Sequence, residues 1–243
     1  MGQTKAKWRG GQLAFYDGST FETVKPIAPI VMYDDFLGTA LNTDIWTLAN
    51  AGGGSTAHAT SNLTFDCVVA GATDENGIYG KDDKAWNADK GFIFEARLAV
   101  TQAPTIGTEI FIGVQNDSYA TGANRAFIAD ELAIFAAFGF YTTVGAGLVA
   151  QIHTDDAVND SGVVTSGVTS VLGTYQVFRM DFTTPASVLF YIDGVQVAAS
   201  TTFNMSNGAN IMFQPMIIAQ KVGVDAGLVT CALDYVKMWQ PTR

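Results

Sequence analysis

The chain has 243 residues, of which 48% are apolar and 15% are charged, so it can bury a large core and is not intrinsically disordered. Its formal net charge of −10 disfavours direct binding to nucleic acid phosphates or anionic lipid. The first residues lack the apolar run of a signal peptide, and no stretch approaches about 18 apolar residues, so we expect a chain made in the cytoplasm without a membrane span.

Residues 1–29 differ from the rest of the chain in charge. Lys5, Lys7, Arg9 and Lys25 lie here, four of only 13 basic residues, and aromatic residues are scattered among them. We predict that 1–29 is an N-terminal docking arm for an acidic partner, with a solvated terminus as the alternative. The predicted partner-binding residues of the arm are Trp8, Arg9, Phe15, Tyr16, Phe21 and Lys25.

Residues 30–243 contain many short runs in which apolar and polar residues alternate, the period of half-buried β-strands. Turns containing Gly and Pro separate these runs. We expect strands over 31–36, 63–70, 77–79, 92–101, 109–115, 148–154, 162–171, 177–182, 188–192, 195–199, 211–219 and 228–239. We expect a turn or short helix over 44–48, a Gly-rich loop over 51–57, and solvated turns over 74–76 and 81–84.

Residues 129–140 are ambiguous. They contain good helix formers, but their Phe and Ile content and Gly139 also suit a buried strand. We expect an irregular or helical start at 130–132, followed by a strand through Tyr141.

The clearest strand pattern covers residues 175–199. Phe178, Met180 and Phe182 alternate with polar residues, which places the three apolar side chains on one face. Asp193-Gly194 then supplies the dipeptide that a two-residue type I′ turn prefers. About a dozen expected strands and no convincing long helix predict an all-β fold. We expect a two-sheet antiparallel jelly-roll sandwich over 30–243, following the N-terminal arm.

Cysteine and histidine do not form a recognisable site. Cys67 and Cys231 are far apart in strand-like sequence, and we expect two free, buried thiols in a reducing compartment. No Cys-x-x-Cys pair is present, so a zinc site is not expected. We interpret His58 as a loop residue. His153 is either oriented by a neighbouring carboxylate or a residue at a strand edge.

Residues 155–160 gather oxygen ligands of the kind that calcium prefers. Asp155, Asp156 and Asp160 are weak calcium candidates, because the segment lacks the Gly and the distal Glu of an EF-hand loop. The alternative is an Asp-rich turn without a metal. We predict no metal and no other cofactor.

A glycan-binding face would need aromatic side chains at the surface. Trp86 and Tyr119 are the predicted glycan contacts, with Trp46 and Tyr141 as further candidates. Packing in the sandwich core is the alternative for these rings, above all for Trp46.

Three passages resemble laminarinase-type glycoside hydrolases: YDDFLGTALNTDIWT (33–47), GFIFEARLAV (91–100), and the meander that ends in LDYVKMWQ (233–240). The resemblance implies a concanavalin-A-like jelly roll, and Asp34 and Asp234 match positions near a structural calcium in some relatives. The hydrolases carry Glu-x-Asp-x-x-Glu on one strand. The nearest matches, 109–114 and 131–136, keep a single Glu each. Because a lone carboxylate cannot both attack and donate a proton, we predict that the chain is not an enzyme.

The segment WRGGQLAFYDGSTFETVKPIAP (8–29) resembles the start of jelly-roll virion proteins of tailed bacteriophages. This resemblance implies a structural protein of the virion, most plainly a capsid decoration (cement) protein on the outer surface of the head. Its partners would be the major capsid protein and two further copies in a homotrimer, with no nucleic acid and no membrane. The alternatives are a carbohydrate-binding adhesin on the virion or its tail and, third, a β-glucan hydrolase.

Overall fold

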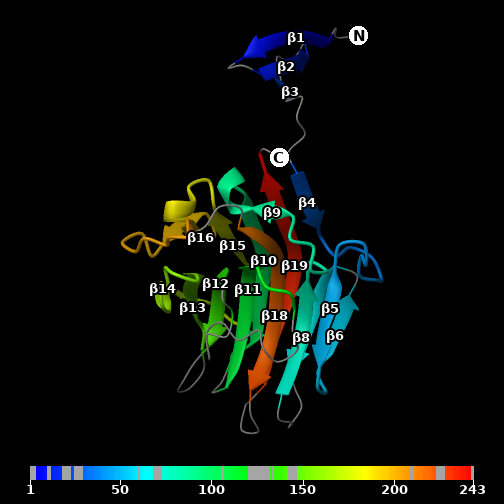
Figure 1. The fold of residues 1–243 in the computed structure, drawn as a ribbon. Helices are drawn as coiled ribbons and strands as arrows, with labels where there is room; N and C mark the ends of the chain where they lie inside the picture. The colour runs from blue at the N-terminus through cyan, green and yellow to red at the C-terminus, as the bar shows by residue number, and fades with distance from the viewer. Residues whose placement is uncertain are drawn as a thin grey trace.

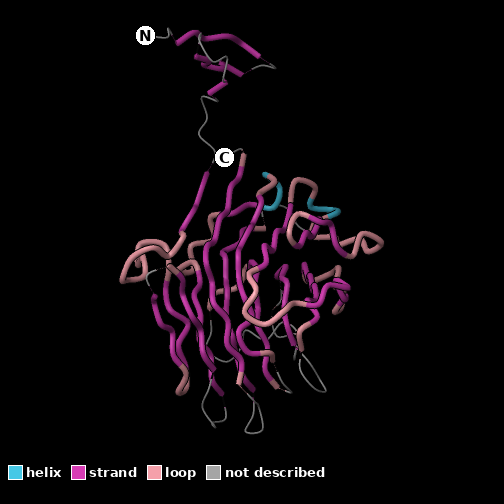
Figure 2. The backbone as a smooth tube through the Cα atoms, turned by 180° about the vertical axis from the view of Figure 1, so that it is seen from behind, coloured by secondary structure: helices cyan, strands magenta, loops and turns pink. Residues whose placement is uncertain are grey.

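The computed structural model describes residues 4–9, 12–17, 23–24, 30–59, 61–67, 73–104, 107–119, 132, 134–141, 147–207, 211–222 and 228–241. Two eight-stranded antiparallel sheets pack face to face as a sandwich (Figure 1), which confirms the predicted all-β jelly roll. Figure 2 shows from behind that the strands run along the length of the sandwich. The described part of the chain contains no helix that could span a membrane.

Sheet I has the strand order β17-β16-β15-β10-β19-β7-β6, and β4 lies beside β19. Its strands are β4 (Ile30–Asp34), β6 (Ser55–Ala59), β7 (Asn62–Cys67), β10 (Ile93–Gln102), β15 (Gln176–Asp181), β16 (Leu189–Ile192), β17 (Val195–Val197) and β19 (Val229–Gln240). The strand β19 is long enough to pair with β7 over its first half and with β4 over its second half. Within the described residues, β4 pairs with β19 alone, so it forms an edge of the sheet.

Sheet II has the strand order β14-β13-β12-β11-β18-β8-β5, and β9 lies beside β18. Its strands are β5 (Thr47–Ala51), β8 (Thr73–Tyr79), β9 (Trp86–Asn87), β11 (Thr108–Gln115), β12 (Ile134–Tyr141), β13 (Val149–Asp156), β14 (Val164–Thr169) and β18 (Met212–Val222). Two short 3-10 turns, η1 (Ala88–Lys90) and η2 (Pro185–Ser187), are the helical elements described.

The predicted meander is present as β15, β16 and β17. Phe178 lies opposite Ile192, and Met180 lies opposite Phe190. The turn residues Asp193 and Gly194 have φ angles of 50° and 78°, both positive as a type I′ turn requires.

The core between the sheets is rich in phenylalanine. Phe94 and Leu98 point inward from β10 and are 0% and 1% exposed. The Phe92 and Phe182 rings stack with their centroids 4.2 Å apart, and Phe138 meets Phe178 edge to face at 5.3 Å. Since burial of one such side chain contributes roughly 1.5–3 kcal/mol, this aromatic layer is a major source of stability.

A second apolar cluster covers the outer face of sheet II. Its members are buried side chains that point away from the core: Ala49, Phe111, Leu132, Phe135, Ala137, Met216 and Ile218, with Tyr79, Tyr119 and Tyr141 packed against them. On β11, Ile110 and Ile112 face the core while Phe111 faces this cluster. Every residue of β11 is therefore buried, which explains its nearly continuous apolar sequence.

Several local predictions need correction. The predicted Gly-rich loop contains β6, so His58 lies in a strand, paired with Leu63. The predicted solvated turn over 74–76 lies inside β8, and all three side chains are buried. These polar residues sit in a strand because pairing with β18 and β5 satisfies their backbone groups. The turn predicted over 44–48 is shorter: residues 43–45 form a turn, and Thr47 already begins β5. The ambiguous segment ends as a strand at Tyr141, as predicted.

The two cysteines are free and buried, as predicted. Burial, with a smaller contribution from Asp74, raises the pKa of the Cys67 thiol to about 12. Burial likewise raises the pKa of Cys231. Both thiols therefore stay protonated and serve as small apolar core residues.

The described residues of the arm form a separate three-stranded sheet. Its strands are β1 (Thr4–Arg9), β2 (Gln12–Asp17) and β3 (Thr23–Val24). Trp8 and Arg9 are on β1, and Phe15 and Tyr16 are on β2. The other predicted arm contacts, Phe21 and Lys25, lie outside the described residues, and the domain boundary at 29/30 stays a prediction.

Candidate functional site

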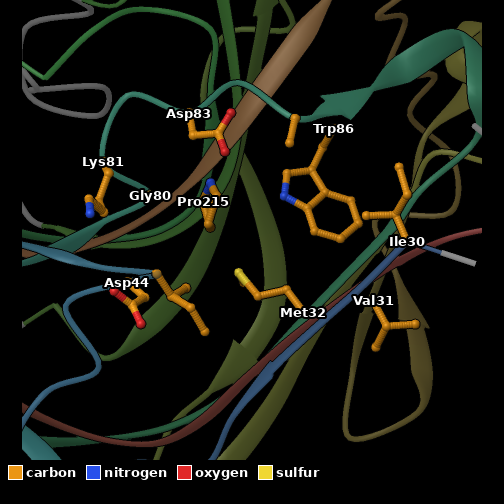
Figure 3. A pocket seen from close by; sticks show the side chains of 11 residues that line it. Ile30, Val31, Met32, Asp44, Gly80, Lys81, Asp83, Trp86 and Pro215 are labelled. Atoms are coloured by element: carbon orange, nitrogen blue, oxygen red, sulfur yellow. The ribbon is translucent and has the colours of Figure 1, made fainter.

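An open cleft of ≈ 400 Å³ lies beside the edge strand β4 (Figure 3). One side is formed by β4, and the other by the segment that links β8 to β9 together with the turn that precedes β5. The cleft is lined by Ile30, Val31, Met32, Asp44, Ile45, Gly80, Lys81, Asp83, Ala85, Trp86 and Pro215.

The floor of the cleft is apolar and its rim is acidic. Trp86 is only 4% exposed and packs in the core between the sheets, 6.3 Å from the ring of Phe92, as the alternative interpretation held; its small exposed part borders the cleft. In the view of Figure 3, Asp83 lies above the indole and Met32 below it, while the Asp44 carboxylate is farther away. Both aspartates are exposed. An aromatic floor with a few polar groups at the rim is the usual composition of a small-molecule site.

Tyr119, the other predicted glycan contact, does not line this cleft. Its ring stacks on that of Tyr79 at 4.4 Å, within the cluster on the outer face of sheet II. Its backbone N–H donates to Asp82 at 2.7 Å. Trp86 and Tyr119 are thus connected to the same segment, residues 80–86, but only Trp86 faces the cleft.

A second, shallower hollow of ≈ 530 Å³ adjoins the cleft and is lined by Ala40, Leu41, Thr43, Trp46, Thr47, Leu48 and Lys81. Trp46 itself is 1% exposed. Its ring packs 6.1 Å from Phe36, and its indole N–H donates to Asp34 at 2.9 Å. Trp46 is therefore a core residue, as the alternative interpretation held.

The outer face of sheet II carries a row of polar side chains. Gln220 on β18 pairs with Glu75 on one side and with Glu109 on the other, and its amide donates to the Glu109 carboxylate. Directly paired residues point to the same face, so both glutamates lie on that face, two strands apart. Both are 0% exposed. Tyr141 continues the row beyond Glu109.

Glu75 is a residue that the sequence analysis missed. The sequence around it, Asp-Glu-Asn, resembles a turn, and only the apolar residues that follow indicate a strand. The other near match to the hydrolase motif starts at Glu131, which lies outside the described residues. Glu109 is therefore not the single carboxylate that the sequence analysis expected, because Glu75 lies on the same face of sheet II.

The calcium candidates use their oxygens to accept N–H donors. Asp156 accepts from the backbone of Val158, Asn159 and Asn207. Burial opposes its ionisation, but these bonds and, above all, one from the side-chain amide of Asn159 outweigh burial and lower the pKa of Asp156. The backbone N–H of Gly162, helped by His153, lowers the pKa of Asp160. Asp155 accepts from the N–H of Ala157. Within the described residues, no group of three or more His, Cys, Asp or Glu side chains could hold a metal.

The remaining predicted residues have structural partners. His153 is 3% exposed rather than at an exposed strand edge, and its Nε2 lies 2.9 Å from Asp160. Asp234 forms an ion pair with Arg97. Asp34 accepts from Trp46, as described, and from the backbone of Phe36.

No protein-family model and no curated protein sequence matches the chain. Solved structures do. An endo-1,3-β-glucanase from Streptomyces sioyaensis has a TM-score of 0.58 at 14% identity over 89% of this chain and 97% of its own. A β-1,3-glucanase from Mycobacterium marinum has a TM-score of 0.58 at 15% identity over 86% and 97%. The carbohydrate recognition domain of Emp47p has a TM-score of 0.55 at 7% identity over 85% and 93%.

The chain therefore has the concanavalin-A-like jelly-roll fold. At these identities the likeness establishes the fold alone. It nevertheless contradicts the prediction that the chain is not an enzyme, because several of the structures it resembles are named glucanases or glycanases. That prediction considered carboxylates on one strand, whereas Glu75 and Glu109 lie on different strands and point to the same face of sheet II.

Proposed function

We propose that this protein is a glycan-binding module whose site is the cleft beside β4. The observation that carries the proposal is an open cleft that combines the apolar side chains of β4 with the exposed carboxylates of Asp44 and Asp83 at its rim.

Sugars suit such a site because they have two kinds of surface. The C–H groups of a pyranose ring pack against apolar and aromatic side chains, and its hydroxyl groups donate hydrogen bonds to carboxylates. The carboxylates of Asp44 and Asp83 outnumber the ammonium of Lys81 in the lining, and the net charge is −10. The site therefore disfavours anionic sugars, and the ligand we propose is a neutral glycan. The named activities of the two glucanases above make β-1,3-linked glucose oligomers the first probe to use.

The test is binding of a β-1,3-linked glucose hexasaccharide by isothermal titration calorimetry. Trp86→Ala should abolish the heat signal, whereas Trp239→Ala, a half-buried tryptophan of sheet I outside the cleft, should not. Because Trp86 also packs in the core, the double variant Asp44→Ala/Asp83→Ala tests the exposed rim without disturbing the core. Unchanged affinity in this double variant, or equal losses in the two tryptophan variants, would refute the proposal.

Hydrolysis of a glycan is a second candidate, and the pair Glu75 and Glu109 favours it. Glycosidases use two carboxylates, one as acid and one as base or nucleophile. Two strand spacings of about 4.8 Å place the backbones of Glu75 and Glu109 roughly 10 Å apart. This spacing is compatible with the separation of about 6.5–9.5 Å between carboxyl groups in inverting enzymes.

Release of reducing sugar from β-1,3-glucan tests this candidate. Glu75→Gln and Glu109→Gln should each abolish the release, while Glu95→Gln on sheet I should leave it intact. Release that survives both substitutions would eliminate this pair as the catalytic groups.

The place of the module on a virion stays a prediction. We propose, as the sequence resemblance implies, that residues 1–29 attach the sandwich to the major capsid protein on the head surface, with the protein as a homotrimer. Deletion of 1–29 should then abolish binding to particles and leave the sandwich folded. Full occupancy of particles by the truncated protein would refute this placement.

A further inference from the structure

Lys81 lies where the cleft meets the second hollow. It is the residue that the two linings share. Its ammonium donates to the backbone carbonyl of Thr43 at 2.9 Å, which joins the segment 80–86 to the turn at 43–45. The two hollows are therefore adjacent, and Lys81 marks their junction.

The backbone at this junction is strained. Lys81 and Asp82 have φ angles of 58° and 60°, so two successive residues other than glycine are in the left-handed region. Each such residue costs free energy, and this conformation persists only where the surroundings enforce it. Strain of this kind accumulates where a site must hold a side chain in one place.

A buried glutamine enforces this conformation. The side-chain oxygen of Gln214 accepts from the backbone N–H of Asp82 at 2.9 Å, and its amide donates to the Asp82 carboxylate at 2.9 Å. The backbone N–H of Tyr119 donates a second hydrogen bond to the same carboxylate. Gln214 is 0% exposed, so the core of sheet II sets the position of Asp82 and, through it, the position of Lys81.

We propose that Lys81 is a specificity-determining residue of an extended site, in which the cleft and the second hollow are consecutive subsites for one neutral glycan chain. This inference rests on the proposed function. The cleft holds one sugar against the apolar side chains of β4, and the second hollow holds sugars farther along the chain. Lys81 donates hydrogen bonds to the sugar that passes over the junction.

The chemistry of lysine fits this role. An ammonium group has three donors and no acceptor, and the Thr43 carbonyl occupies one of them. The remaining N–H groups of Lys81 can donate to sugar oxygens, whereas the carboxylates of Asp44 and Asp83 can accept from sugar hydroxyl groups. The two kinds of side chain therefore bind different parts of the sugar. The site therefore binds longer glycans more tightly than short ones, because only a longer glycan reaches from the cleft into the second hollow.

Calorimetric titration with β-1,3-linked glucose oligomers of two, four and six units tests this inference. Wild-type protein should bind the hexasaccharide more tightly than the disaccharide. Lys81→Met, which keeps the aliphatic stem and removes the charge, should lower the affinity for the longer oligomers about tenfold, the effect of losing one hydrogen bond to a charged group, and should leave the disaccharide nearly unchanged. Lys81→Arg should restore part of the loss.

Lys84→Met is the matched control, since Lys84 lies in the same segment but lines neither hollow. Thermal unfolding of each variant verifies that it is folded. Equal wild-type affinity for all three oligomers, or equal losses in Lys81→Met and Lys84→Met, would overturn the extended site while the glycan-binding cleft stands. Absence of binding to every oligomer would instead refute the proposed function.

Discussion

The outer face of sheet II and the cleft beside β4 carry similar residue types, aromatic rings and carboxylates, in opposite states. On the sheet, Glu75 and Glu109 are fully buried and Glu109 accepts from Gln220. In the cleft, the carboxylates of Asp44 and Asp83 are exposed and line an open volume.

This difference separates carboxylates that the protein covers from carboxylates that face solvent. A buried carboxylate with protein donors contributes to stability as long as those donors remain. An exposed carboxylate contributes little to stability and is available for binding. The residue type does not distinguish buried from exposed carboxylates. The hydrogen-bond donors around each carboxylate in the folded protein do.

The largest expected effect is on the packed face. Phe111→Ala should lower the free energy of unfolding by about 3–5 kcal/mol, because it leaves a cavity in the second apolar cluster. Urea denaturation measures this loss. Tyr33→Ala, at a side chain that is 53% exposed, is the control and should cost much less. Similar losses in the two variants would mean that the outer face of sheet II is not packed.

A smaller effect is expected at a structural carboxylate. Asp156→Ala leaves the N–H groups of Val158, Asn159 and Asn207 without their acceptor, which should cost about 1–3 kcal/mol. The exposed Asp44→Ala should stay within about 0.5 kcal/mol of wild type. A neutral Asp156 variant in urea denaturation would place Asp156 with the ligand-accessible carboxylates.

The same carboxylates predict the response to acid. Because folding lowers the pKa values of Asp156 and Asp160, these groups stabilise the protein above the ordinary Asp pKa of about 3.9. That contribution is lost as the pH falls through this value toward the lowered pKa of the folded state. Melting temperatures between pH 5 and pH 2.5 measure the loss, and Asp156→Ala should show a shallower decline. An unchanged slope in the variant would exclude Asp156 as its source.

The smallest effect is expected in the cleft. Asp83→Asn keeps a hydrogen-bond acceptor, so the affinity for the hexasaccharide should fall only about two- to threefold, within the range of a weakened hydrogen bond. The melting temperature should not change. A large drop in melting temperature would show that Asp83 belongs with the structural carboxylates.

Much of the fold could be predicted from local sequence. The alternation of Phe178, Met180 and Phe182 places these side chains in the core, and Asp193-Gly194 forms its hairpin turn. Both patterns involve residues that are close together in the sequence, so they can be recognised without knowing the fold. The strand β6 was missed because small and polar residues follow a run of glycines, and pairing with β7 decides its conformation.

The candidate site could be predicted only in part. Trp86 was identified because a tryptophan near the surface is a common sugar contact, but nothing in the sequence connects it to Asp44. These two residues line the same cleft because β4, the turn at 43–45 and the segment 80–86 converge in the folded chain. The pairing of Glu75 with Glu109 through Gln220 likewise arises from strand order, which local patterns do not reveal.

The most direct test of the central claim is an NMR titration of the isotope-labelled protein with the β-1,3-linked glucose hexasaccharide. The account predicts that the Trp86 indole and the Lys81 amide signals move with increasing ligand, while the amide signals of Glu109 and Gln220 stay in place. Movement confined to Glu109 and Gln220, with Trp86 and Lys81 unchanged, would contradict it.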